Sequence, residues 1–255
     1  MAFMGSGKGG ALSNPFVKNL TKETSTQTNC ATYGGIIAKC SFFIATVLLG
    51  AALSFVLDAV SPSALLIGAA ICGICFLICP FITIFARKTA PVTGSLTFIS
   101  LGYLVGIIAV LVPEYRSIIL LAAGITVAIV FSLQILFSAG VIRVTAKLRS
   151  VVCTCLLTMM LSGLLLFVFA LIPAFRPVYL VVATNPVICI AISLIYIVIA
   201  CMCLLSDFYT VQSVVEGGLN KSCEWFVAYS LSYTIVWLFM EVLDLLLTIK
   251  RLADD

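Results

Sequence analysis

The residues able to do chemistry in this chain are acids that gather towards its end. Asp58 and Glu114 are the only acids between Cys40 and Ser206. Seven acids follow that stretch, and five of them precede the last two residues of the chain: Asp207, Glu216, Glu224, Glu241 and Asp244. A carboxylate at or near hydrocarbon is costly unless it is paired, hydrated or protonated. The late acids are therefore the first candidates for a functional site.

Asp207 follows one long apolar stretch, and Glu224 precedes the next. Each has a structural interpretation, Asp207 as a solvated cap and Glu224 as a first-turn acid that complements the helix dipole. In the functional interpretation, both face one membrane side, come together and change protonation near neutral pH. Their oxygens suit Ca²⁺ or protons, so the same two acids are the candidate metal ligands. Arg87 and Arg143 are the candidate counter-charges for Asp207.

Glu241 and Asp244 stand three positions apart, on one face of the last apolar stretch. With Lys250 and Arg251 just beyond, they fit an interfacial cluster whose side chains reach towards the headgroups. The alternative is a vestibule that attracts cations at a pore mouth.

Other chemistry is disfavoured. The chain has no histidine, which removes the usual proton shuttle and metal ligand. Most of its 11 cysteines lie inside apolar runs, where they are typical of small packing residues. We expect no enzymatic activity, no nucleic-acid partner and no cofactor, with Ca²⁺ or H⁺ as the permeant or regulatory ion.

The composition indicates which kind of secondary structure positions these acids. The chain is 63% hydrophobic and 9% charged, with a mean hydropathy of +1.27. Soluble domains carry about a quarter charged residues. The apolar runs show no alternation with polar residues, so an all-α membrane protein is predicted rather than a barrel.

Seven apolar runs are each close to the ~20 residues that span hydrocarbon. Short connections, several with proline, predict antiparallel neighbours in one bundle over residues 36–251, after a flexible polar tail at 1–35. The predicted spans are Cys40–Leu57, Ser63–Ala86, Pro91–Val112, Ser117–Ile142, Val151–Ile172, Val187–Ser206 and Trp225–Leu247.

Basic residues predict the orientation. Ten of the 14 fall on the N-terminal side of the membrane, and four (Arg116, Arg176, Lys250 and Arg251) fall on the other. The positive-inside rule then places the N-terminus in the cytoplasm and the C-terminus outside. Asp207 and Glu224 face the cytoplasm in this arrangement.

Three segments together resemble the Bax inhibitor / YccA family, in its bacterial branch with a polar N-terminal extension. They are ARKTAPVTG at 86–94, GVIRVTAKLRS at 140–150 and the ending that starts DFYTVQSVVEGG at 207. The resemblance implies a seven-helix bundle of the bacterial inner membrane, with the last helix inside a ring of the others. Some members act as pH-sensitive Ca²⁺ leak channels gated by two aspartates, and others are linked to the control of membrane proteases.

Asp207 matches the first aspartate of that gate. The second, within the last helix, is not matched, because residues 229–234 read YSLSYT; Glu224-Trp225 fits the acid before tryptophan of the bacterial branch. The resemblance therefore implies a pH-sensitive Ca²⁺ leak with a cytoplasmic-side gate formed by Asp207 and Glu224. The alternative is a non-transporting protein that modulates a membrane protease or another membrane partner.

Overall fold

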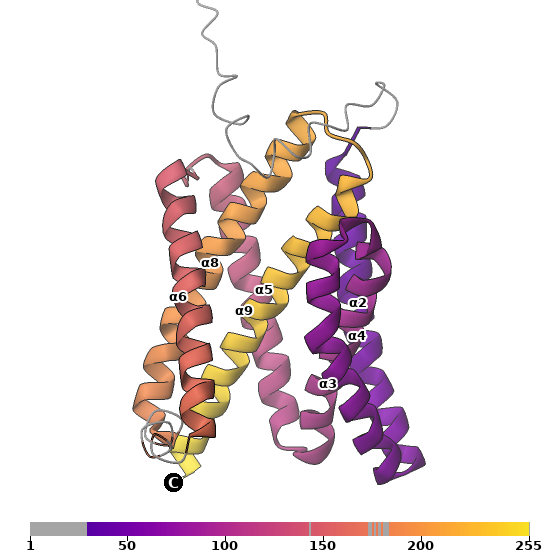
Figure 1. Cartoon of the computed structure of the whole chain (residues 1–255), viewed down its shortest axis with the longest axis vertical. Helices are drawn as coiled ribbons and strands as arrows, with labels where there is room; N and C mark the ends of the chain where they lie inside the picture. The colour runs from indigo at the N-terminus through magenta and orange to yellow at the C-terminus, as the bar shows by residue number, and fades with distance from the viewer. Residues whose placement is uncertain are drawn as a thin grey trace, which may run out of the picture. The chain divides into compact units, whose positions relative to one another are not determined.

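Apart from one isolated bridge, helices make up the regular structure in the computed structural model, which describes residues 30–142, 144–172, 175, 177, 180 and 184–254 (Figure 1). Seven of these helices are long and apolar enough to cross a membrane. The predicted all-α fold with seven membrane helices is confirmed, and all seven predicted spans fall on helices. The helices are α2 Tyr33–Val60, α3 Pro62–Phe85, the short η2 Arg87–Thr89, α4 Ala90–Leu111, α5 Tyr115–Ser138, α6 Ala146–Leu171, α8 Pro186–Glu216 and α9 Cys223–Asp254.

Short polar residues fix several helix starts. The Thr32 hydroxyl accepts from the Gly35 backbone N–H at 3.0 Å and caps α2. Ser61 caps α3 in the same way, with Pro62 in the first turn, and Thr145 caps α6. Each cap satisfies a backbone donor that has no partner within its own helix.

The end of α8 differs from the prediction. The apolar run ends at Ser206, but the helix continues to Glu216, so Asp207 lies inside α8 rather than at its end. No proline or glycine interrupts residues 207–216, and the helix stops at the first glycine pair. Gly218 takes the left-handed backbone (φ 62°) and Leu219 N–H bonds to Val214 O, which together form a Schellman cap.

The helices divide between two compact units. Among the described residues, the first unit comprises residues 30–106 together with residues 209–230, which are the end of α8, the loop after it and the start of α9. The second unit comprises residues 107–208 and the chain from Leu231 onward. That the last helix lies inside a ring of the others stays a prediction.

Within the first unit, α2 and α4 approach so closely that only glycine fits at the contact. A Cβ atom on Gly102 would meet the Val47 backbone carbonyl, and one on Gly50 would meet the Ile99 carbonyl. The aromatic rings of Phe43 and Phe98 pack beside this contact, 5.0 Å apart between centroids. Small residues allow such close contact between helices in lipid, where dispersion packing has to hold helices together.

We predict that Gly102→Ala destabilises the protein by about 1–3 kcal/mol, because the new methyl group must displace backbone rather than a flexible side chain. Gly73→Ala in α3 is the matched control, since nothing lies within 4 Å of its Cβ position. The measurement is thermal unfolding in detergent micelles by circular dichroism. Equal midpoints for the two variants would contradict the close α2–α4 contact.

Candidate functional site

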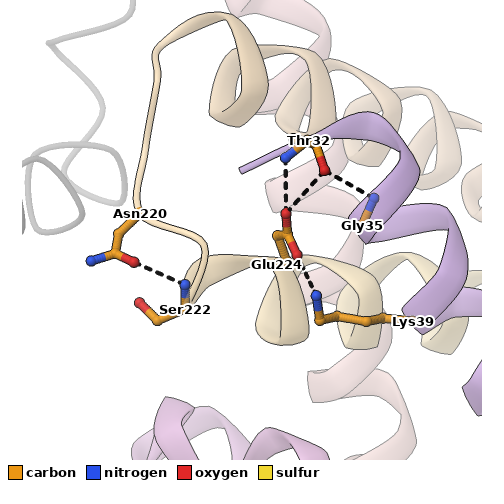
Figure 2. A network of polar contacts seen from close by, with 6 residues as sticks. All are labelled: Thr32, Gly35, Lys39, Asn220, Ser222 and Glu224. Atoms are coloured by element: carbon orange, nitrogen blue, oxygen red, sulfur yellow. Dashed lines mark hydrogen bonds and ion pairs between the residues drawn. The ribbon is translucent and has the colours of Figure 1, made fainter. Parts of the chain in front are cut away.

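Glu224 lies in the first turn of α9, and none of its surface is exposed. Figure 2 shows its carboxylate aimed at the start of α2. One oxygen accepts from the Thr32 backbone N–H at 2.9 Å and from the Thr32 hydroxyl at 3.3 Å. The other oxygen forms an ion pair with the Lys39 ammonium. The buried negative charge is thus matched by a positive charge and two further donors.

This carboxylate sits at two helix starts at once. It belongs to the first turn of α9, and it accepts from the capping residue of α2. The positive ends of both helix dipoles favour a negative charge at this place. The position of Glu224 is therefore favoured by backbone electrostatics as well as by Lys39.

Gly35 makes the approach possible. A Cβ atom at this position would lie 2.5 Å from both carboxylate oxygens of Glu224. The neighbouring Gly34 has nothing within 4 Å of its Cβ position, so the constraint is specific to Gly35. The glycine is needed here for space, because its φ is not in the left-handed region.

Residues Cys30–Thr32, which we call the strap, attach to the loop between α8 and α9. Cys30 forms an isolated bridge with Asn220, and Ala31 N–H donates to Leu219 O at 2.7 Å. These contacts place Cys30–Gly35 within the folded part, although the sequence assigns them to the tail; residues 1–29 lie outside the described residues. Together with the Glu224 contacts, the strap ties the start of α2 to the start of α9.

Sequence reasoning identified Glu224 but missed Lys39, Thr32 and Gly35. Lys39 reads as one more basic residue on the N-terminal side of the membrane, yet its side chain is only 14% exposed and lies 5.2 Å from the centroid of the Trp225 ring. The available signal was its position, since it stands one residue before the apolar run of the first predicted span. A lysine so close to hydrocarbon suggests a partner acid.

The structure describes one of the two candidate counter-charges for Asp207. The Arg87 guanidinium lies 5.2 Å from the centroid of the Phe226 ring, within the first unit. Arg143 lies outside the described residues. Asp207 belongs to the second unit and Glu224 to the first, so the predicted pairing of the two acids stays a prediction.

Asp207 is partly buried in α8 and accepts a hydrogen bond from the Thr234 hydroxyl of α9. Thr234 comes from the YSLSYT segment, where the resemblance implies a second aspartate. A hydroxyl from that segment thus reaches Asp207 in place of a carboxylate. Within the described residues, no three His, Cys, Asp or Glu side chains are grouped so that they could hold a metal ion.

The acids near the end of α9 have partners of their own. Glu241 accepts from the Trp237 indole N–H at 2.8 Å, and Asp244 accepts from the Ser193 hydroxyl of α8 at 3.0 Å. Lys250, expected beside these acids, instead forms an ion pair with Glu114 at 3.3 Å. The vestibule proposed for Glu241 and Asp244 stays a prediction.

Comparison with known families gives one match. The family model described as Bax inhibitor 1 like matches residues 14–251. The chain matches none of the curated proteins and none of the solved structures with which it was compared. The match covers every described helix up to Arg251, so it includes both Asp207 and Glu224.

We predict that Glu224→Gln and Lys39→Met each lower the free energy of unfolding by about 3–5 kcal/mol, since each leaves one buried charge without its partner. The double variant should lose less than the sum of the two, because it removes both charges. Unfolding midpoints in detergent measure this cycle. Glu216→Gln, at an exposed site, is the control; additive losses would show that the pair is not coupled.

We also predict that Gly35→Ala destabilises the start of α2, whereas Gly34→Ala does not. The methyl group at position 35 pushes the Glu224 carboxylate away from Thr32 and Lys39. Hydrogen exchange followed by mass spectrometry measures the effect as faster exchange at residues 30–39 in Gly35→Ala alone. Similar exchange in both variants would argue against the close contact.

Proposed function

The chain belongs to the Bax inhibitor 1-like family, and we propose that it is a pH-sensitive cation leak pathway with Asp207 as the gating carboxylate. We place it in the cytoplasmic (inner) membrane of a bacterium, as the resemblance implies, with its N-terminus in the cytoplasm, as the distribution of basic residues predicts. We propose no enzymatic activity and no resident cofactor for it. The ion that passes is Ca²⁺, as the resemblance implies, or H⁺.

One observation supports the gate above the others: a partly buried aspartate within a long apolar helix bonds to a hydroxyl of the next helix. A carboxylate at such a place is costly, and it marks an ion or proton path more often than a structural contact. The Thr234 hydroxyl holds the carboxylate in place by donating to it. Protonation of Asp207 changes that contact and, with it, the packing of α8 on α9 in the second unit.

Glu224 has a different role in this proposal. Its carboxylate is already matched by Lys39 and by two donors of Thr32, and it is completely buried. A group in this state is poorly placed to exchange an ion. We therefore assign it the structural task of holding the start of α9, and Asp207 the task of responding to pH.

We predict that liposomes with the native protein leak Ca²⁺ or protons at a rate that changes with pH, and that Asp207→Asn removes this change. The amide keeps the shape of the side chain and imitates the protonated, uncharged state at every pH. Fluorescent Ca²⁺ and pH indicators inside the liposomes measure the flux. Asp58→Asn, an exposed position at the end of α2, is the matched control and should retain the native pH response.

Identical flux curves for the native protein and Asp207→Asn would contradict the gate. A native protein that conducts neither ion would contradict the leak itself. That second outcome favours the alternative function, a non-transporting partner of a membrane protease. Deleting residues 1–29 and testing for loss of a co-purifying membrane protein then examines that alternative.

A further inference from the structure

Two polar helix faces meet within the second unit. On α9, successive polar residues are separated by three, four and three positions, so they lie on one side of the helix. On α8, four polar residues recur at intervals of three, seven and four positions. We call these the α9 face (Thr234, Trp237, Glu241 and Asp244) and the α8 face (Ser193, Tyr196, Cys203 and Asp207).

Hydrogen bonds join the two faces at both of their ends. At one end Thr234 donates to Asp207, and at the other Ser193 donates to Asp244 at 3.0 Å. The two bonds are 14 residues apart on α8 and ten apart on α9 (207 − 193 and 244 − 234). At 1.5 Å per residue these separations are about 21 and 15 Å along the helices. The faces therefore oppose each other over half or more of a hydrocarbon core ~30 Å thick.

The stretch between the two ends also contains polar groups. Glu241 is half-buried and accepts from the Trp237 indole one turn away on α9. The antiparallel register set by the two end bonds places Tyr196 of α8 at about the height of Glu241. A polar side chain thus recurs at every turn or two between Asp207 and Asp244.

Helix association alone does not account for these residue types. At both ends a hydroxyl of one helix donates to a carboxylate of the other, although hydroxyls or amides alone are sufficient for such contacts in lipid. The faces nevertheless include three carboxyl groups, Asp207, Glu241 and Asp244. Asp207 and Glu241 are partly buried, and ionisable groups within apolar helices are costly and point to an ion or proton path.

We propose that the α8 and α9 faces form a proton route between the Asp207–Thr234 pair and the Ser193–Asp244 pair, with Glu241 as the carboxyl group that holds the proton midway. This rests on the proposed function and specifies its ion and its path. In each step a proton leaves one oxygen and binds the next, directly or through water, so Glu241 alternates between carboxylate and carboxylic acid with no other bond changed.

Coordination chemistry favours protons over Ca²⁺ on this route. Ca²⁺ takes six to eight oxygen ligands around one point. The carboxyl groups here are strung along the helices instead, and the described residues contain no group of three acidic, cysteine or histidine side chains able to hold a metal. A proton needs only one donor or acceptor after another, and polar side chains recur along both of these faces.

The test compares proton flux in liposomes that contain a pH indicator and are driven by a potassium diffusion potential. We expect Glu241→Gln to abolish the flux of the native protein, because an amide still accepts from Trp237 but binds no proton. Glu216→Gln, at the exposed end of α8, is the matched control and should conduct as the native protein does. Thermal unfolding of Glu241→Gln should match that of the control, because packing is preserved.

The outcomes separate the route from the proposed function. If Asp207→Asn loses the pH response while Glu241→Gln conducts normally, the route is wrong and the gate stands. Ca²⁺ flux without proton flux also overturns the route alone. If Glu241→Gln fails to fold, a second experiment tests the route on the native protein. The protein is treated with dicyclohexylcarbodiimide, which adds to protonated carboxyl groups in apolar surroundings. Labelled Glu241 with lost flux supports the route; unlabelled Glu241, or labelled Glu241 with full flux, overturns it.

Discussion

A carboxylate withdrawn from water has to be given other partners, and this constraint shapes the first unit around Glu224. The acid is completely buried at the start of α9, so a lysine, a capping threonine and the ends of two helix dipoles gather around it. The requirement extends to Gly35, whose missing side chain leaves room for the carboxylate. It also explains why the strap lies against the loop after α8, since Thr32 is the last residue of that strap.

The acids of the second unit accept hydrogen bonds from another kind of side chain. Asp207, Glu241 and Asp244 accept from a threonine, a tryptophan and a serine, all of which are neutral. Protonation of a carboxylate changes the hydrogen bonds that it can accept, and with them the local structure. Glu224, with its Lys39 ion pair, is an acid that holds the fold. The proposals for Asp207 and for the α8 and α9 faces rest on the hydrogen bonds that join these two helices.

Much of the fold was predictable from local sequence. Each membrane helix is marked in the sequence by a long apolar run. Such a run in lipid forms a helix, because its backbone hydrogen bonds must be made within the segment. The predicted end of α8 came too early in the sequence. Hydropathy indicates where the lipid ends, whereas a helix ends where its capping signals lie. Asp207 therefore sits inside the helix, and the glycine pair at 217–218 supplies the stop.

The sequence by itself determined the membrane class, the seven helices and the short list of acids worth attention, since composition and periodicity are local properties. Tertiary structure alone decided which partners the acids find on other helices. Lys39 lies 185 positions before Glu224, and Ser193 lies 51 before Asp244. The charges and residue types along the sequence do not specify which helices lie against each other. The physical reason is that a buried charge selects its partner by proximity in space, and that proximity is set by the packing of whole helices.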